Sequence, residues 1–435
     1  MRWYAGAIAI LLAALALGLG LLAYAMYVLL AVLILSRLLA RTWAENLAAS
    51  RECNRFTANV GETVAVVLNV QNKGGLPVAW VLLEDLLPRD ALGAQPPKLS
   101  VHGNRLQLAM LGSRARKTLY YQLRCNNRGY YQIGPLVLET GDLFGLHRRW
   151  RVLTSPHFVL VYPKTVALEG YDIASRRPIG EVRMAHRLYE DPTRIAGVRP
   201  YQTGDPMNRI HWRATARTGV LHSKIYEPSS VAGATLLLDF HRDSYDPEHE
   251  PYRSELAVTA AASLANALYY LGQQIGLVTN GRDAADRIRQ EGWDPDPRTR
   301  RDAQRSASML DKSERLQPVV VETRRGPEQL MRILEALARL ELTDGLTVAG
   351  LIDEAASRIP RDATVIALVC GVSTETALAL GGLRRRGFAV TAIVNAFHVH
   401  EFEQAGGPLV AEGIEVRHLV DEAGLVDLCR QYVLR

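Results

Sequence analysis

The feature that most constrains this chain is an uncharged run near its N-terminus. No charged side chain occurs from Trp3 to Leu35, a stretch of 33 residues. As one straight helix this run measures about 50 Å, whereas the hydrocarbon core of a bilayer is about 30 Å thick. Two arrangements remain open: a strongly tilted single helix, or a hairpin with arms of about 15 residues each that turns near Gly18-Leu19-Gly20, where glycine permits a tight turn. Either arrangement predicts a transmembrane anchor over residues 1–41.

Basic residues flank the run and predict its orientation. Arg2 precedes it, and Arg37 and Arg41 follow it. Because basic side chains near a span are retained in the cytoplasm, the rest of the chain is expected on that side of the inner, cytoplasmic membrane of a bacterium. A cleaved signal peptide would have an apolar region of only roughly 7–15 residues. The lipid bilayer is therefore the first predicted partner.

The charge balance and the cysteines exclude several classes of protein. The net charge of +6 is small for 51 basic and 45 acidic residues, and it fits anionic lipid headgroups. The same surplus would also fit nucleic acid, but the membrane anchor favours lipid, and few aromatic side chains beyond Trp212 and Tyr201 accompany the arginines described below, so we expect no nucleic-acid partner. None of the four cysteines forms a CxxC pair, so reduced thiols are favoured over disulfides or zinc; they are Cys53, Cys125, Cys370 and Cys429.

Residues 50–165 read as an all-β domain. From Thr63 to Val70 apolar side chains alternate strictly, which places them on one face of a strand. After the turn cluster Asn72-Lys73-Gly74-Gly75, short apolar runs continue between turn residues: Pro77–Leu83, Leu106–Met110, Thr118–Leu123, Tyr130–Leu138 and Phe158–Tyr162. Strands this short with such turns predict an immunoglobulin-like β-sandwich.

From residue 233 to residue 435 short apolar strands alternate with helical segments. The predicted strands are Thr235–Asp239, Ile275–Thr279, Val365–Val369, Ala389–Val394 and Ile414–His418. Helices are expected around Leu256–Leu271, Gly326–Leu340, Thr374–Arg386 and Leu425–Val433. This alternation predicts a doubly wound parallel α/β domain. Residues 282–315 contain nine basic and eight acidic side chains and read as a solvated insertion.

Residues 166–232 are expected to pack on the α/β domain, and they contain the least ordinary segment. Asp205-Pro206 predicts a helix start, and Gly219 predicts the residue just past its end. On that helix Arg209, Arg213 and Arg217 share one stripe, because they are four residues apart. Two readings remain open. The arginines pair with carboxylates of this chain, or they receive a phosphate, a lipid headgroup or an acidic partner surface; the candidate carboxylates are Glu190, Asp191 and Glu227.

This segment is the predicted interaction site. Its candidate residues are Arg199, Tyr201, Gly204, Asp205, Arg209, Trp212, Arg213 and Arg217. The motifs Tyr201-Gln-Thr-Gly204-Asp205, Arg209-Ile-His-Trp212-Arg213 and Ala216-Arg217-Thr-Gly219-Val-Leu221 resemble the signature of the domain of unknown function 58 family. Flanking stretches are similar to the same family, so the resemblance covers most of the chain; they include Arg128-Gly129-Tyr130, Asp142-Leu-Phe-Gly145 and Thr235–Asp239.

The resemblance implies an architecture and partners. It implies an N-terminal membrane hairpin, a β-domain and a region similar to a von Willebrand factor A domain. It also implies an association with AAA+ ATPases of the MoxR type and with membrane transglutaminase-like proteins. Because the biochemical activity of the family is largely unassigned, the resemblance bears on architecture more than on function.

The resemblance also suggests a metal-binding site. A von Willebrand-type domain often binds Mg²⁺ with Asp-x-Ser-x-Ser after its first strand, since hard oxygen ligands suit that ion. Here the strand ends Asp239-Phe-His241-Arg-Asp243, so both serines are replaced. Asp239 and Asp243 are the candidate ligands, with Ser373 or Thr374 as a borrowed one. The alternative is that Asp239 caps the neighbouring loop, with no cofactor.

No catalytic motif is evident. The chain has neither Gly-x-Ser-x-Gly nor a phosphate loop, and His398 and His400, beside Glu401 and Glu403, read as solvated loop residues. We therefore predict a membrane-anchored cytoplasmic scaffold, not an enzyme, that works with a MoxR-type AAA+ ATPase in assembly or maturation of a partner complex. The alternative is a metal-dependent enzyme or a metal-mediated ligand-binding domain that uses Asp239.

Overall fold

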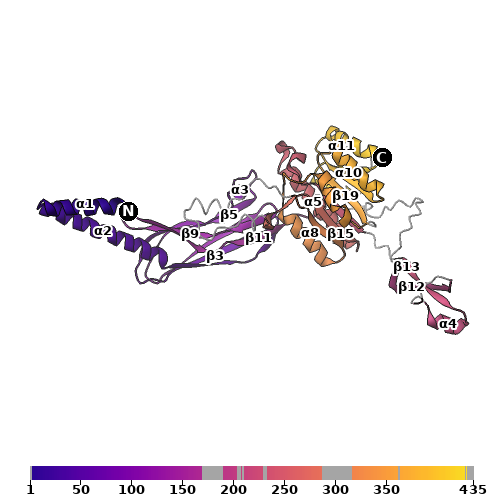
Figure 1. The fold of residues 1–435 in the computed structure, drawn as a ribbon, viewed down its shortest axis with the longest axis horizontal. Coiled ribbons are helices and arrows are strands. Elements are labelled where there is room, and N and C mark those ends of the chain that lie inside the picture. Colours follow the sequence, from indigo (N-terminus) through magenta and orange to yellow (C-terminus); the bar gives the residue numbers. More distant parts are fainter. Residues whose placement is uncertain are drawn as a thin grey trace. The chain divides into compact units, whose positions relative to one another are not determined.

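A computed structural model describes residues 2–168, 190–202, 207, 210–228, 233–286, 316–360, 363–426 and 428 (Figure 1). Its contacts divide the chain into two compact units. The first consists of Met1–Thr165, Gly281–Leu316 and Leu334–Gly345, and the second of Val166–Asn280, Gln317–Ile333 and Leu346–Arg435. Each unit has its own core, so the two are described separately.

The N-terminal run forms two helices, α1 (Arg2–Ala16) and α2 (Gly20–Glu45). They meet at a tight turn in which Gly18 adopts a φ of 65°, so the hairpin is the arrangement found and a single helix is not. The arms are unequal, with 15 and 26 residues. The expectation of equal arms was wrong because α2 continues beyond the apolar run, and its end packs on the sandwich through Trp43 and Ala44.

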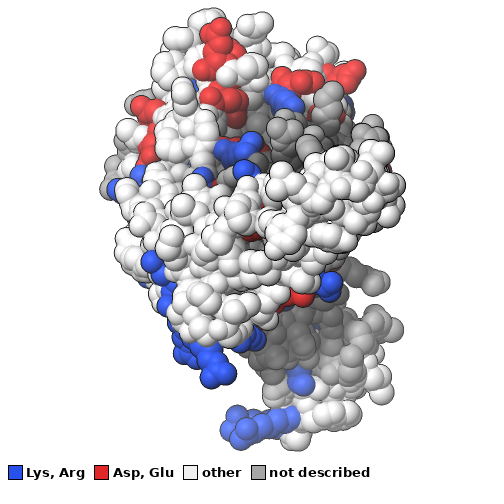
Figure 2. Space-filling view, turned by 90° about the vertical axis from the view of Figure 1, so that its left-hand side faces the viewer, with Lys and Arg blue, Asp and Glu red and all other residues white. Residues whose placement is uncertain are grey.

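The described part of the chain contains one helix, α2, that is long and apolar enough to cross a membrane, and α1 is shorter. Many of the large apolar side chains on both helices are exposed; they include Ile8, Leu12, Leu15, Leu21, Tyr24 and Val28. Figure 2 views the molecule from the side on which the α1–α2 turn lies, and broad uncharged areas separate the charged side chains there. This surface suits lipid better than water.

The β-rich region forms a sandwich of predominantly antiparallel sheets. One has the order β1-β3-β7-β5, a second β10-β9-β4-β6 and a third β2-β11-β8. The strands are β1 (Leu47–Cys53), β2 (Thr57–Asn59), β3 (Thr63–Asn72), β4 (Val78–Asp85), β5 (Leu99–Gly103), β6 (Leu106–Leu111), β7 (Arg116–Cys125), β8 (Gly129–Ile133), β9 (Leu136–Gly141), β10 (Arg148–Thr154) and β11 (His157–Tyr162), with a short helix α3 (Arg89–Gly93). Burial alternates along β3 as its sequence predicts, and Val64, Val66, Leu68 and Val70 are fully buried.

A buried ion pair lies inside this sandwich. Arg51 of β1 pairs with Asp85 of β4, and the Tyr121 hydroxyl donates to the same carboxylate over 2.6 Å. The Arg51 Nη1 atom also donates to the carbonyl oxygens of Ile133 at 3.1 Å and Ser155 at 2.8 Å. The guanidinium is therefore neutralised and hydrogen-bonded where it is buried, which is the condition for a charge in a core.

The second unit contains a six-stranded sheet of order β17-β15-β14-β19-β20-β21. Its strands are β14 (Gly233–Leu238), β15 (Gln274–Thr279), β17 (Val319–Arg324), β19 (Ala363–Val369), β20 (Ala389–Asn395) and β21 (Glu415–Leu419). All neighbours pair in parallel except β17, which is antiparallel to β15. The chain leaves β14 toward β15 on one side and later builds β19 to β21 on the other. Strands are added on both sides of β14, which is the strand order of a doubly wound sheet.

The helices of this part of the chain are α5 (Tyr252–Tyr270), α8 (Pro327–Arg339), α9 (Val348–Ala355), α10 (Thr374–Arg385), α11 (Val399–Ala411) and α12 (Glu422–Val426). Short 3₁₀ turns cover Arg242–Ser244, Pro247–His249 and Ala356–Arg358, and β16 (Arg282–Asp283) pairs with β18 (Leu340–Glu341). The switch point of the doubly wound sheet lies between β14 and β19, because the strand order reverses there.

Several predicted elements differ in the structure. The predicted strand Tyr130–Leu138 is two strands, β8 and β9, which belong to different sheets and are separated by Gly134-Pro135. Antiparallel β17 and helices α9 and α11 were not predicted. Of the charged insertion, residues 287–315 lie outside the described residues, as do Asp427 and residues 429–433 of the predicted last helix. Three described cysteines, Cys53, Cys125 and Cys370, are free thiols; Cys429 is outside the described part.

Candidate functional site

The predicted interaction segment is a small β-hairpin with a helix between its strands. Strands β12 (Glu190–Pro200) and β13 (His222–Pro228) pair antiparallel, and α4 (Trp212–Thr218) lies between them in the chain. Asp205 and Pro206, the predicted helix start, lie outside the described residues; Ile210 and His211 are not helical, and α4 begins at Trp212. The cap is His211, whose Nδ1 accepts the Ala214 N–H over 3.0 Å.

The end of α4 is as predicted. Gly219 adopts the left-handed conformation with a φ of 71°, and its N–H donates to the Thr215 carbonyl over 3.0 Å. Arg213 and Arg217 lie four residues apart on α4 and are both exposed. Arg209 precedes the helix, so the predicted column of three arginines on one helix is not found. Gly204, Asp205 and Arg209 lie outside the described residues.

Two other predicted residues fix the strand ends. Arg199 is half-buried, and its Nη1 donates to the Pro200 carbonyl over 3.4 Å. The Tyr201 N–H donates to the Leu221 carbonyl over 2.8 Å, which ties the two ends of the hairpin together. The carboxylates proposed to pair with the arginines, those of Glu190, Asp191 and Glu227, have side chains outside the described set, so that reading remains a prediction.

Large apolar side chains surround the two exposed arginines. Trp212 is 66% exposed, whereas Ile210, which forms a bridge to Ser223 of β13, is buried. We define the hairpin surface as the exposed residues Val198, Met207, Trp212, Arg213, Arg217, Val220 and Leu221. Exposed tryptophan, methionine and arginine are enriched in protein–protein interfaces and their hot spots. Sequence reasoning identified Trp212 and the arginines but not the apolar part of this surface.

Asp239 follows β14 and holds the next loop together. It is fully buried, and its Oδ1 accepts the His241 N–H over 3.0 Å and the Asn280 amide over 3.1 Å. Burial raises the pKa of this carboxyl, although hydrogen bonds from Ser244, His241 and Asn280 oppose the shift. The Asp243 side chain, by contrast, is 89% exposed. These two carboxyl groups therefore lie in different environments.

The Mg²⁺ site predicted at Asp239 stays a prediction. The Ser373 hydroxyl, a candidate borrowed ligand, accepts the Thr376 N–H over 3.1 Å as the cap of α10. Among the described residues no group of three His, Cys, Asp or Glu side chains converges to hold a metal ion. The observed hydrogen bonds of Asp239 match the alternative in which it braces its own loop.

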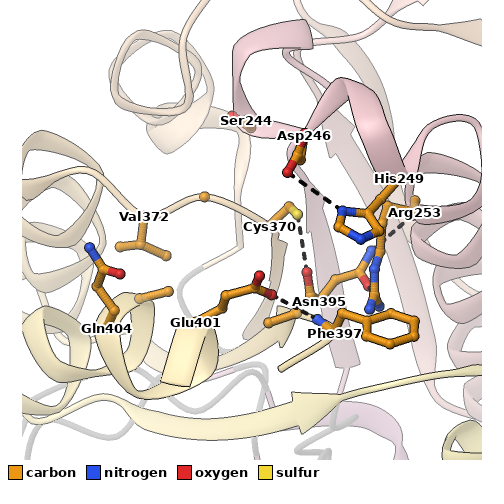
Figure 3. A pocket seen from close by; sticks show the side chains of 13 residues that line it. Ser244, Asp246, His249, Arg253, Cys370, Val372, Asn395, Phe397, Glu401 and Gln404 are labelled. Carbon is orange, nitrogen blue, oxygen red and sulfur yellow. Dashed lines mark hydrogen bonds and ion pairs between the residues drawn. The ribbon is translucent and has the colours of Figure 1, made fainter. Parts of the chain in front are cut away.

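A cavity of about 270 Å³ lies at the carboxyl ends of β19 and β20, next to the switch point of the sheet (Figure 3). Its lining comes from the loop after β14, the start of α5, the loop after β19 and the start of α11; it includes Ser244, Asp246, His249, Arg253, Cys370, Val372, Asn395, Phe397, Glu401 and Gln404. The residues Phe397–His400 were predicted as a loop, but His398 caps α11 and His400 lies in its first turn.

Arg253 of α5 is the buried cation of this cavity. It is 3% exposed, and its Nη1 donates to Asn395 Oδ1 at 2.9 Å and to the Val420 carbonyl at 2.8 Å. The Asn395 amide donates back to the Arg253 carbonyl over 2.8 Å. Within the described residues Nη2 has no hydrogen-bond partner, and no carboxylate forms an ion pair with this guanidinium. Burial lowers the pKa of Arg253, as expected for an unpaired cation.

The lining of the cavity includes one thiol, that of Cys370, and two carboxylates, those of Asp246 and Glu401. Burial raises the pKa of Cys370 to about 12, and its thiol donates to the Asn395 carbonyl over 3.0 Å. Cys370 is therefore a thiol at neutral pH and not a nucleophilic thiolate. Glu401 Oε2 accepts the Phe397 and His398 N–H groups at 3.1 and 3.2 Å, and these bonds lower the pKa of Glu401, which stays ionised.

Sequence reasoning missed this cavity, although one signal was present. Arg253 lies on the same helical stripe as Leu256 and Ala260, which are buried as predicted. A single arginine on an apolar stripe is a buried charge that needs a partner. Its neighbours Asn395 and Glu401 are more than 140 residues away in the sequence, and only the fold brings them together.

Comparisons with known proteins agree with the predicted family. Residues 197–292 match the family model described as protein of unknown function DUF58. The Bacillus subtilis protein named uncharacterized protein YeaD is 24% identical over 244 residues, which cover 54% of this chain and 56% of that protein. The chain thus spans about half the length of this relative.

Similarity to solved structures is slight. The CARDB domain of a Pyrococcus furiosus protein is 16% identical with a TM-score of 0.18, over 26% of this chain and 86% of that one. Proximal thread matrix protein 1 from mussel byssus is 12% identical with a TM-score of 0.28, over 46% of each chain. Likenesses this low carry no functional argument.

Proposed function

From the premise that this chain is a member of the DUF58 family, we propose that it is a membrane-anchored interaction protein that docks a partner protein on its hairpin surface. The observation that carries the proposal is the exposure of Trp212 together with Met207, Val220 and Leu221, beside Arg213 and Arg217. This surface lies largely within the matched region. In this proposal the protein binds and positions its partner without catalysing a reaction.

The anchor supports a position at the membrane. Helix α2 is long and apolar enough to cross a bilayer, and α1 of 15 residues, about 22 Å long, packs beside it and adds apolar surface. Arg37 and Arg41 follow the uncharged run, and the preference of basic residues for the cytoplasm favours folded units inside the cell, at the inner membrane.

The chemistry of the hairpin surface indicates the kind of partner. Two exposed guanidiniums beside a tryptophan suit an acidic surface with an apolar centre, because charged rims guide binding and aromatic centres supply affinity. The resemblance to DUF58 proteins makes a MoxR-type AAA+ ATPase the proposed partner, with a membrane transglutaminase-like protein as a further member of the assembly. The α/β unit would act as a von Willebrand factor A-like domain in this assembly.

Affinity purification of the full chain from detergent-solubilised membranes tests the proposal. The variant W212A/R213E should lose the AAA+ ATPase that co-purifies with the wild type. The matched control is M110A/R116E, which removes an 82% exposed methionine of β6 and an exposed arginine of β7 from the sandwich. Equal recovery with both variants, or no AAA+ ATPase with the wild type, contradicts the proposal.

A further inference from the structure

The buried Arg253 lacks the anion that its burial calls for. A guanidinium taken out of water loses several kcal/mol of hydration, by order of magnitude, unless a counter-charge and hydrogen bonds replace that hydration. Its partners here are the neutral oxygens of Asn395 and Val420, and Nη2 has no partner among the described residues. Arg253 is therefore positioned to bind an anion that comes from outside the described part of the chain.

The same cavity has an anion that lacks a cation. Glu401 uses Oε2 for its two backbone hydrogen bonds, which leaves Oε1 available toward the cavity. Glu401 and Arg253 interact electrostatically, but no ion pair joins them. Figure 3 shows both side chains at the cavity. A positive and a negative group thus line one small space without neutralising each other.

The remaining walls are suited to a small, partly apolar molecule. Val372, Ala396 and Ala405 contribute apolar surface. The Cys370 thiol already donates a hydrogen bond to the Asn395 carbonyl. The Phe397 ring lies against the guanidinium at 4.8 Å and stacks on His249 at 5.7 Å. Because Phe397 is 46% exposed, its ring can turn away from Arg253 without disturbing a core. Because Nη2 is itself buried, a ligand that reaches it requires this ring to move.

The location agrees with ligand binding. Ligands of doubly wound sheets bind outside the carboxyl ends of the strands at the switch point, and this cavity lies there. Asp246 is a second carboxylate of the lining; its Oδ1 accepts the Glu248 N–H at 3.0 Å and its Oδ2 lies 3.5 Å from His249 Nδ1, on the His249 side of the cavity.

We infer that this cavity binds a small amino-acid-like zwitterion, whose carboxylate meets Arg253 Nη2 and whose ammonium group meets Glu401 Oε1. Charge-assisted hydrogen bonds at both ends give the orientation, and the apolar wall accepts a modest aliphatic side chain. The inference is independent of the hairpin surface, which contributes none of these residues.

Isothermal titration calorimetry of the full chain in detergent tests the inference with three matched probes. L-leucine carries both charges, 4-methylpentanoate lacks the ammonium group, and 3-methylbutylamine lacks the carboxylate. Saturable binding should be tightest for L-leucine and about tenfold weaker or more for either analogue. No saturable binding of L-leucine, or equal binding of 3-methylbutylamine, overturns the inference.

Substitutions test the contributions of Glu401 and Arg253 to binding separately. Glu401→Gln should weaken L-leucine about tenfold and leave 4-methylpentanoate unchanged, whereas Arg253→Met should abolish the binding of both. Arg385→Met, which removes an exposed arginine of α10, is the control and should change nothing. Phe397→Ala should keep L-leucine binding, so it provides a test even if the Arg253 variant fails to fold. Unchanged L-leucine binding in Glu401→Gln, or its loss in Phe397→Ala, contradicts the assignment.

Discussion

Both units of this protein bury arginines, and two of these, Arg51 in the sandwich and Arg253 in the α/β unit, differ in their partners. In the sandwich, Arg51 pairs with Asp85 and also donates to the Ile133 and Ser155 carbonyls. In the α/β unit, Arg253 has only neutral acceptors and keeps Nη2 unpartnered within the described residues. Burial alone therefore does not show what a charged residue does.

This difference suggests a way to distinguish a buried charge that stabilises the fold from one that binds a ligand. A buried pair such as Arg51–Asp85 costs much to break, because one member is left charged and unsolvated. An unpaired cation such as Arg253 already bears that cost in the ligand-free state, so its removal should harm the fold less. The comparison can be tested by changing each arginine in the same way.

The largest expected effect is that of Arg51→Met on the sandwich. The substitution leaves the Asp85 carboxylate buried without its counter-charge, so we expect a loss of about 3–5 kcal/mol in the free energy of unfolding. Hydrogen exchange of the amides in β3 and β7 of the full chain measures it. Glu139→Gln, which breaks the more exposed pair between Glu139 and Arg148, is the control and should cost at most about 1 kcal/mol. A similar loss in both variants would show that the Arg51–Asp85 pair stabilises the sandwich no more than the exposed pair does.

Arg253→Met should have a much smaller effect on the α/β unit. Two hydrogen bonds to carbonyl-type acceptors are lost, at about 1 kcal/mol each, but the cost of burying an unpaired cation is lost with them. We therefore expect a net change of about 1 kcal/mol or less, measured by hydrogen exchange of β14 and β19. A loss as large as that of Arg51→Met would mean that Arg253 is chiefly structural, and the comparison would fail.

The sequence predicted most of the fold but little of the cavity. Strict alternation located β3, and buried apolar runs located β14, β15, β19, β20 and β21, because local periodicity reflects which face is buried. Antiparallel β17 could not be predicted because its direction depends on pairing with a distant strand. Helix α4 was predicted too long because the His211 cap was not recognised. The cavity joins Arg253, Asn395 and Glu401, which only tertiary structure brings together.

The smallest effect is a pH dependence that should appear in both units. Burial lowers the pKa of His418 in the α/β unit, and burial and then Arg51 lower that of His157 in the sandwich. Each folded pKa lies below the unfolded value of about 6.5, so below that pH the unfolded chain binds more protons and stability falls as pH falls.

Thermal unfolding of the wild type should therefore shift to lower temperature between about pH 7.5 and pH 5.5. His418→Asn should reduce this shift in the α/β unit and His157→Asn in the sandwich, as followed by hydrogen exchange in each. A histidine variant with the wild-type pH dependence throughout would contradict the role assigned to that ring.

The central proposal is that a partner protein binds the hairpin surface. A photo-crosslinking amino acid placed at position 212 of the full-length protein in living cells tests it most directly, with the same group at position 110 of β6 as the matched site. We predict an adduct with an AAA+ ATPase of the membrane fraction from position 212 and none from position 110. No adduct at position 212, or the same adduct at both positions, would contradict the claim.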